Sequence, residues 1–129
     1  MARIGEDPAP PGPVVTAFAA GGGFSVRGEL FEGLFLTPER AFAWSPPSAR
    51  ALSIEDLAPV LALDPQPEFV LLGTGSGLAL PPVALRWALD ERGIGLEVMD
   101  SRAAARTWGL LRGEERWIVA ALMPLAGPD

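Results

Sequence analysis

Short β-rich segments separated by turn signals fill the chain from residue 14 to the middle forties. Glycines and a proline interrupt the apolar stretches at intervals that suit short strands. The predicted strands are Val14–Phe18, Phe24–Leu30, Gly33–Thr37 and Ala41–Trp44. The third and fourth are joined at Pro38 and Glu39, so this part of the chain is predicted to form an antiparallel meander. Ser45-Pro46-Pro47-Ser48 then breaks the pattern.

Helical and strand patterns alternate in the second half. Ser53 and Asp56 resemble a capping box and predict a helix over Ile54–Leu63, although Pro59 lies inside it. Three later strands are predicted, over Phe69–Leu72, Leu96–Met99 and Arg116–Leu125. Two helices are predicted between them. The first begins at Pro82 and ends at Gly93, a glycine of the kind that terminates helices, and the second runs from Asp100 or Ser101 to about Leu111. Such alternation predicts parallel strand pairing, so the fold class is α/β: an N-terminal antiparallel meander followed by βαβαβ-type alternation.

Length and composition predict one domain. A chain of 129 residues that is 49% hydrophobic can bury one sizeable core. We expect a single domain over residues 14–129 and a flexible, proline-rich leader over residues 1–13. The leader lacks the pattern of a signal or transit peptide, and no apolar run reaches the roughly 18 residues of a membrane span. A cytoplasmic protein that does not span the membrane is therefore predicted.

Charge and missing residue types narrow the function. The net charge of −6, without a basic cluster, disfavours nucleic-acid binding. The sequence has no Cys, His, Tyr, Lys or Asn, which excludes thiol and imidazole metal sites, Ser-His-Asp triads and a P-loop lysine. We therefore predict no metal site, no cofactor and no catalytic residues. Any catalysis would depend on Asp, Glu, Ser, Thr, Arg and backbone groups.

The glycine loop in LLGTGSG, residues 71–77, is the main candidate for ligand binding. It fits neither the dinucleotide fingerprint nor the Walker motif, because the sixth-position glycine and the lysine are missing. An apolar strand followed by GTGSG resembles the first motif of S-adenosylmethionine-dependent methyltransferases, with Glu97 or Asp100 available for a ribose. The alternative is a tight turn that needs glycine only for its backbone conformation.

Other polar residues are predicted at the same edge of the sheet. If the strands over 69–72 and 95–99 are parallel neighbours, their carboxyl ends place Gly73, Thr74, Gly75 and Ser76 beside Asp100 and Ser101. Arg102 and Arg106 lie one helical turn apart and could clamp an anion there, or could form a solvated face. These eight residues form the predicted ligand cleft, which would take a nucleotide, S-adenosylmethionine or a phosphate ester.

Two of the four tryptophans are candidates for a partner surface. Trp87 and Trp108 stand beside polar positions, and tryptophan is enriched where proteins bind one another. The alternative for each is a packing role in the core.

Several segments in order resemble a widespread, largely uncharacterised α/β domain family. They are GGGFSVRG, Trp44, FVLLGTGSG, LPPVALRWALDERGIGLEVMDSRAAARTWGLL and RWIVAALMPL, and together they cover about Val14 to Leu125. The family includes the mitochondrial respiratory complex I assembly factor three and an adipogenesis-associated animal protein. The resemblance implies a single three-layer domain around a mixed central sheet and, in one branch, a role in assembling a membrane enzyme through protein contacts. It implies no established catalytic residues.

This sequence departs from the family pattern at three places. Family members often have Thr where Ser101 stands, Cys where Ala105 stands, and an aromatic-Asn pair in place of Trp108 and Gly109. A pocket that used such a thiol or amide would not operate here. The leading hypothesis is a noncatalytic accessory or assembly protein with an unidentified protein partner. The alternatives are a ligand-binding domain or enzyme that uses the Gly73–Ser76 loop, and homo-oligomerisation through an apolar face.

Overall fold

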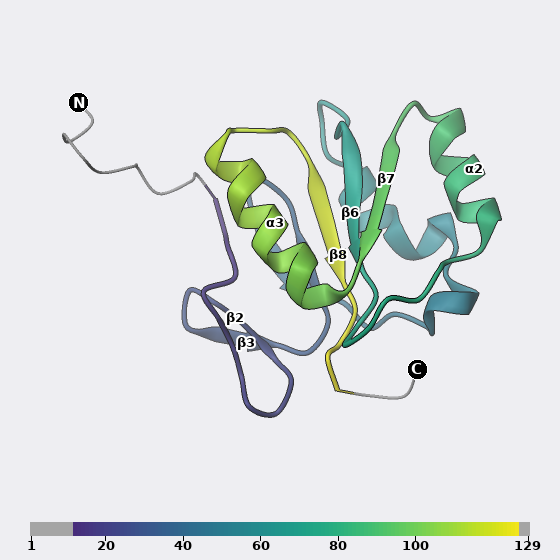
Figure 1. The fold of residues 1–129 in the computed structure, drawn as a ribbon. Helices are drawn as coiled ribbons and strands as arrows, with labels where there is room; N and C mark the ends of the chain where they lie inside the picture. Colours follow the sequence, from purple (N-terminus) through teal and green to yellow (C-terminus); the bar gives the residue numbers. More distant parts are fainter. Residues whose placement is uncertain (1–11, 127–129) are drawn as a thin grey trace, which may run out of the picture.

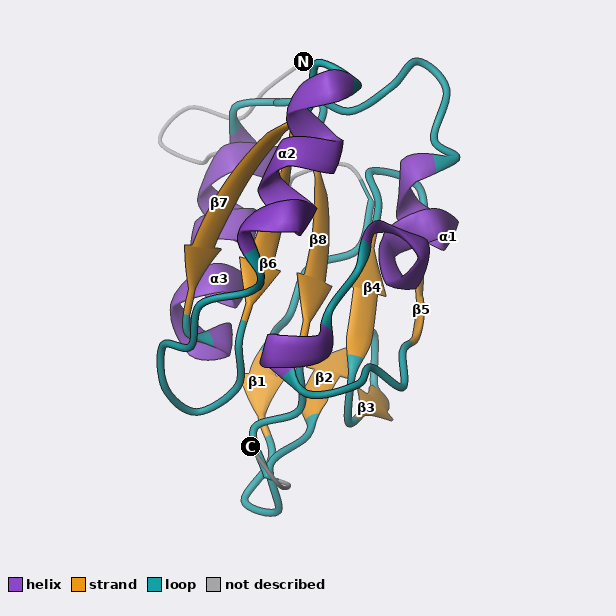
Figure 2. Cartoon of the chain, turned by 90° about the vertical axis from the view of Figure 1, so that its right-hand side faces the viewer, coloured by secondary structure: helices purple, strands orange, loops and turns teal. Residues whose placement is uncertain are grey.

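A five-stranded mixed sheet forms the centre of the protein. The computed structural model describes residues 12–126. The strand order is β5-β4-β8-β6-β7. The strands are β4 (Leu34–Leu36), β5 (Ala41–Ala43), β6 (Phe69–Gly73), β7 (Gly95–Met99) and β8 (Val119–Leu122). Strand β6 pairs in parallel with β7 and β8, whereas β4 pairs antiparallel with β5 and β8. Strand β8 therefore joins the antiparallel and parallel parts of the sheet (Figure 2).

Helices cover both faces of this sheet. The α-helices are α1 (Ala58–Leu61), α2 (Val83–Glu91) and α3 (Ser101–Gly113), and two short 3₁₀ helices, η1 (Ala49–Ala51) and η2 (Ile54–Leu57), precede α1. Figure 1 shows α2 and α3 on opposite sides of the strands. A second, three-stranded antiparallel sheet consists of β1 (Ala17–Phe18), β2 (Phe24–Val26) and β3 (Glu29–Phe31), in that order.

Alternation of side chains along the central strands produces two cores. Successive strand residues point to opposite faces, so Val70 and Leu72 of β6 join one core and Leu71 joins the other. The first core includes Leu85 and Leu89 of α2 together with residues of η2 and α1. The second includes the buried residues of α3 and of β2 and β3. The three layers confirm the predicted α/β fold class with its mixed central sheet.

The predicted meander is divided between the two sheets. Phe24–Leu30 is not one strand, because Arg27 and Gly28 have φ values of 52° and 83° and turn the chain between β2 and β3. Positive φ at both central residues is typical of the type I′ hairpin turn. The predicted strand Val14–Phe18 is limited to Ala17–Phe18. The hairpin at Pro38 and Glu39 is present and connects β4 to β5.

Other predicted elements differ from the structure in their extent or helix type. Ile54–Leu63 is a 3₁₀ turn followed by a single turn of α-helix, and Pro59 occupies the first turn of α1, where a missing N–H costs little. The capping box of Ser53 and Asp56 is confirmed, with Ser53 N donating to Asp56 Oδ2 at 2.8 Å. The final strand is limited to Val119–Leu122, and α3 continues to Gly113.

The predicted leader falls mostly on residues 1–11, which lie outside the described residues. Pro13, the last residue of that leader, is buried, and its carbonyl accepts a hydrogen bond of 2.9 Å from Trp108 Nε1. Between residues 12 and 126, no helix combines the length and apolarity needed to cross a membrane.

Candidate functional site

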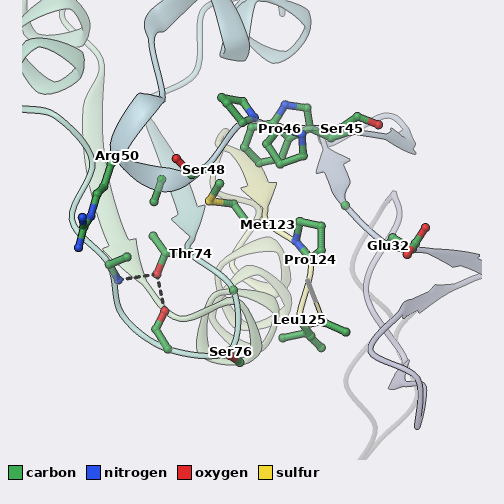
Figure 3. Close-up of a pocket in the computed structure, with 18 of the residues that line it drawn as sticks. Glu32, Ser45, Pro46, Ser48, Arg50, Thr74, Ser76, Met123, Pro124 and Leu125 are labelled. Atoms are coloured by element: carbon green, nitrogen blue, oxygen red, sulfur yellow. Dashed lines mark hydrogen bonds between the residues drawn. The ribbon is translucent and has the colours of Figure 1, made fainter. Parts of the chain in front are cut away.

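A cleft of about 810 Å³ lies at the carboxyl ends of β6 and β8. Four separate parts of the chain line it: residues 32–33, 44–50, 74–79 and 123–126. They are the β3–β4 connection, the segment after β5 that includes η1, the glycine loop after β6, and the segment after β8 (Figure 3). Because β4 is antiparallel to β8 and β5 to β4, the start of β4 and the end of β5 reach this same edge. In α/β sheets, the carboxyl edge of parallel strands is the usual place for a ligand.

Hydrogen bonds fix the first half of the glycine loop to the start of α3. Thr74 N donates to Met99 O at 2.9 Å, and Gly75 N donates to Ser101 Oγ at 2.8 Å. Ser101 N donates to Gly75 O at 2.8 Å. Gly75 has a φ of 100°, a conformation that strongly favours glycine. This part of the loop is therefore a structural turn whose amides already have partners.

Ser101 connects three segments at the end of the sheet. Its side chain is fully buried, and besides accepting from Gly75 N it donates to Met123 O at 2.8 Å. Met123 N in turn donates to Gly73 O at 2.9 Å. A buried hydroxyl with both a donor and an acceptor partner is satisfied, so Ser101 holds the cleft wall in place and has no exposed surface for a ligand.

The second half of the loop is exposed and keeps a defined shape. Thr74 Oγ1 accepts from Ala79 N at 3.0 Å and donates to Gly77 O at 2.7 Å (Figure 3). Ser76, Gly77 and Leu78, which lie between these anchor points, are exposed. Within the described chain, none of the hydrogen bonds that fix the loop uses the amides of these three residues. They are the loop groups that can meet a ligand.

The cleft has one cation and one carboxylate in its lining. Arg50 of η1 lies beside the glycine loop, and Glu32 lies at the opposite end (Figure 3). Met123 and Pro124 lie between them on the segment after β8. Both charged side chains are on exposed residues, so they form the two ends of the cleft and the apolar groups form its middle.

The structure separates the predicted cleft residues into two groups. Thr74, Gly75 and Ser76 line the cleft, and Gly73 and Ser101 lie directly behind it. The other three predicted residues, Asp100, Arg102 and Arg106, lie outside the lining.

Asp100, Arg102 and Arg106 have surroundings that differ from those of the cleft residues. Asp100 is the N-cap of α3, where its carboxylate accepts from Ala103 N at 2.8 Å. The guanidinium of Arg102 lies 5.9 Å from the centre of the Phe18 ring, in the geometry of a cation–π contact. Arg106 is exposed on α3. The predicted anion clamp of Arg102 and Arg106 therefore does not face the cleft.

The two candidate tryptophans have opposite surroundings. Trp108 has no exposed surface and packs in the core beneath α3, so its prediction as part of a partner surface was wrong. Trp87 is 63% exposed on α2. Three further large apolar residues nearby in the sequence are also exposed: Leu78, Leu80 and Val83. We refer to Leu78, Leu80, Val83 and Trp87 as the apolar strip; along the chain these residues extend from the glycine loop, where Leu78 also lines the cleft, to α2.

Sequence reasoning missed the wall formed by residues 44–50. Ser45-Pro46-Pro47-Ser48 was interpreted only as a break between elements, and Arg50 was not considered. The predicted hairpin of β4 and β5 could have indicated this wall, because the direction of β5 decides which edge of the sheet the next segment reaches. As for metals, no group of three or more acidic side chains suited to an ion occurs within residues 12–126.

Comparison with known sequences gives one family and several relatives. Residues 17–123 match the model of the protein family of unknown function DUF498/DUF598. The chain is 33% identical over 103 residues to the NADH dehydrogenase (ubiquinone) 1 alpha subcomplex assembly factor 3 of Danio rerio, covering 79% of this chain and 59% of that protein. The corresponding protein of Bos taurus is 36% identical, with 81% and 58% covered. The chain thus spans less than two thirds of the length of these relatives.

Bacterial proteins match over more of their length. An uncharacterised protein of Rhodobacter capsulatus is 33% identical, with 82% of this chain and 81% of that protein covered. A crystal structure from Bordetella parapertussis superposes with a TM-score of 0.79 at 32% identity, covering 91% of this chain and 99% of the other. The solution structure of a Bordetella pertussis protein, described as a Mth938-like domain, gives a TM-score of 0.77 at 27% identity, with 97% and 94% covered. The chain belongs to the DUF498/DUF598 family of proteins of unknown function.

Proposed function

We propose that the protein is a noncatalytic, cytoplasmic accessory factor that helps to assemble an NADH dehydrogenase complex through protein contacts. The relatives named as assembly factors of NADH dehydrogenase support this role. The absence of Cys, His and Lys from the sequence supports a noncatalytic role, because these residues supply most nucleophiles and general bases.

The apolar strip is the structural observation that carries the proposal. Its four side chains are 57–73% exposed, and Val83 and Trp87 lie four residues apart on one face of α2. Fully burying each of them against a partner would contribute about 1.5–3 kcal/mol before the cost of association. Tryptophan is one of the residue types enriched at the energetic centres of protein interfaces. We therefore assign the contact with the assembling complex to this strip.

Deletion and rescue test the role. The gene is deleted in the organism of origin, and assembled NADH dehydrogenase is measured on native gels by in-gel activity. Deletion should reduce the assembled complex, and the wild-type gene should restore it. The double variant Val83→Ser/Trp87→Ser should fail to restore it at equal protein level. The matched control is Leu110→Ser, which changes a side chain that is 72% exposed on α3. This control should restore the complex.

Two results would contradict the proposal. Normal amounts of assembled complex after deletion would remove the assembly role. Light scattering provides the second result: if the wild type is a dimer and Val83→Ser/Trp87→Ser is a monomer, the strip joins two copies of this chain and is not a surface for another protein.

A further inference from the structure

We propose that the cleft binds a monoanionic carboxylate carried on an apolar body, with Arg50 at the carboxylate end. This inference goes beyond the accessory role, because it concerns a small ligand group and does not depend on Val83 or Trp87 of the apolar strip. The cleft volume of about 810 Å³ is typical of small-molecule sites, which run from roughly 300 to 1,000 Å³. Its place at the carboxyl edge of β6 and β8 is also where α/β sheets bind ligands.

The charged side chains that line the cleft favour one class of ligand. Arg50 is the single cation that lines the cleft within the described chain, and Glu32 is the single carboxylate. A guanidinium matches a carboxylate with two parallel hydrogen bonds. A phosphate monoester or a nucleotide polyphosphate would bring about two or more negative charges to one arginine, on a protein with a net charge of −6. The lining therefore favours a single negative charge.

Neutral donors also line the cleft. The exposed segment of Ser76, Gly77 and Leu78 offers its amides, and the Ser48 and Ser76 hydroxyls line the same cleft. The two hydrogen bonds of Thr74 Oγ1 hold this segment in shape before any ligand arrives. A loop that is already ordered costs less entropy on binding.

The middle of the cleft suits an apolar group. Met123, Pro124 and Pro46 lie between Arg50 and Glu32 (Figure 3), and Trp44 also contributes to the lining. Glu32 at the far end would repel a second anionic group. The ligand is therefore expected to be apolar beyond its carboxylate. A free organic acid has this chemistry, and so does the C-terminal residue of a peptide that ends in an apolar side chain.

Binding measurements on the whole chain distinguish these sources. The probes are phenylbutyrate, its amide, inorganic phosphate, and a short peptide ending in leucine with either a free or an amidated C-terminus. Each is titrated by isothermal calorimetry and by amide NMR shifts of residues 74–79 and 123–126. We expect the carboxylate of each pair to bind at least about tenfold more tightly than the amide, since a hydrogen bond to a charged group is stronger than one between neutral groups. Tighter binding of phenylbutyrate indicates a free acid, and tighter binding of the peptide indicates a chain terminus.

Matched variants tie the binding to the cleft. Arg50→Gln should weaken carboxylate binding about tenfold, whereas Arg106→Gln, which changes an exposed arginine outside the cleft, should not. Gly77→Leu adds a bulky side chain to the cleft lining and should weaken carboxylate binding; the fold can accept it, because a Cβ at Gly77 meets nothing within 4 Å. Gly21→Leu is the control, since a Cβ there is equally free and Gly21 lies outside the cleft.

Three results would overturn the inference. The first is equal binding of each acid and its amide, or no binding of either acid at millimolar concentration. The second is tighter binding of phosphate than of phenylbutyrate. The third is unchanged carboxylate binding by both Arg50→Gln and Gly77→Leu, each checked to be folded by circular dichroism. None of these results bears on the deletion and rescue of NADH dehydrogenase assembly, so the two proposals can fail separately.

Discussion

A Cβ atom on Gly73 would lie 2.7 Å from Ser101 Cα and 2.8 Å from Ser101 Oγ. Gly73 ends β6 and Ser101 begins α3, so the missing side chain lets the helix start directly against the end of the strand. The cleft wall depends on this approach, because Ser101 bonds the glycine loop and the segment after β8 together.

Gly73→Ala should therefore destabilise the protein. A methyl group would force apart two backbone segments, and overpacking of this kind typically costs about 1–3 kcal/mol. Urea denaturation followed by circular dichroism measures the change. Gly77→Ala is the control, because its Cβ has free space, and it should change the free energy of unfolding by less than about 0.5 kcal/mol. Equal stability of the two variants would show that α3 can move away from β6 at little cost.

Trp108→Phe should destabilise the fold much more than Trp87→Phe. Trp108 is fully buried, and its Nε1 donates to Pro13 O, so phenylalanine leaves that carbonyl without its partner. The expected loss is about 1–3 kcal/mol. Trp87 is 63% exposed, and its substitution should stay within about 0.5 kcal/mol. Chemical denaturation of both variants checks the difference, and similar losses would contradict the assignment of Trp108 to the core.

Arg27→Asn should stabilise the hairpin between β2 and β3. Arg27 has a φ of 52°, a left-handed conformation that costs an ordinary side chain energy and that asparagine adopts more readily. We expect a gain of roughly 0.5–1 kcal/mol in the free energy of unfolding. Gly28, with a φ of 83°, provides the opposite test, because Gly28→Ala should cost roughly 1 kcal/mol. A destabilising Arg27→Asn would indicate that the arginine side chain stabilises the turn in another way.

The ion pair of Glu68 and Arg116 should make part of the stability depend on pH. Arg116 Nη2 lies 2.9 Å from Glu68 Oε1, and this hydrogen bond is the main reason why the pKa of Glu68 lies below its ordinary value. A lowered pKa in the folded state gives stability that is present above the unfolded pKa and is lost as the pH falls through the folded pKa. Wild type should therefore exceed Glu68→Gln in stability at neutral pH and lose this advantage in acid.

A double-mutant cycle with Arg116→Gln isolates the pair. Both side chains are substantially exposed, so the coupling should also weaken as salt is added. Thermal unfolding across acidic to neutral pH, at low and high salt, provides the measurement. A coupling that persists in acid would mean that the pair acts through contacts other than charge.

The second half of the fold was more predictable than the first. Phe69–Gly73 is an uninterrupted apolar stretch, and Asp100 caps α3 with its own side chain, so local signals place these elements. The turn that separates β2 from β3 was not predicted, because arginine is not typical of the left-handed positions of a hairpin turn. Its conformation is imposed by the pairing of the two strands, which no local pattern displays.

The candidate site was predicted only in part for a similar reason. The parallel pairing of β6 and β7 was inferred from strand and helix alternation, and it placed the glycine loop correctly beside Ser101. The opposite wall, with Arg50, depends on the pairing of β4 with β8, two strands that are far apart in the sequence. The orientation of α3 could not be predicted either. The spacing of Arg102 and Arg106 places them on one side of the helix, but it does not specify whether that side faces the cleft.

Leu78 belongs to the cleft lining and to the apolar strip at once. A molecule seated in the cleft and a protein seated on the strip would therefore compete for, or share, the same side chain. Such coupling is reciprocal. If the molecule in the cleft changes the affinity for the protein partner by some factor, the partner changes the affinity for that molecule by the same factor. Under the two proposals, occupancy of the cleft would therefore change the affinity of the protein for its partner through Leu78.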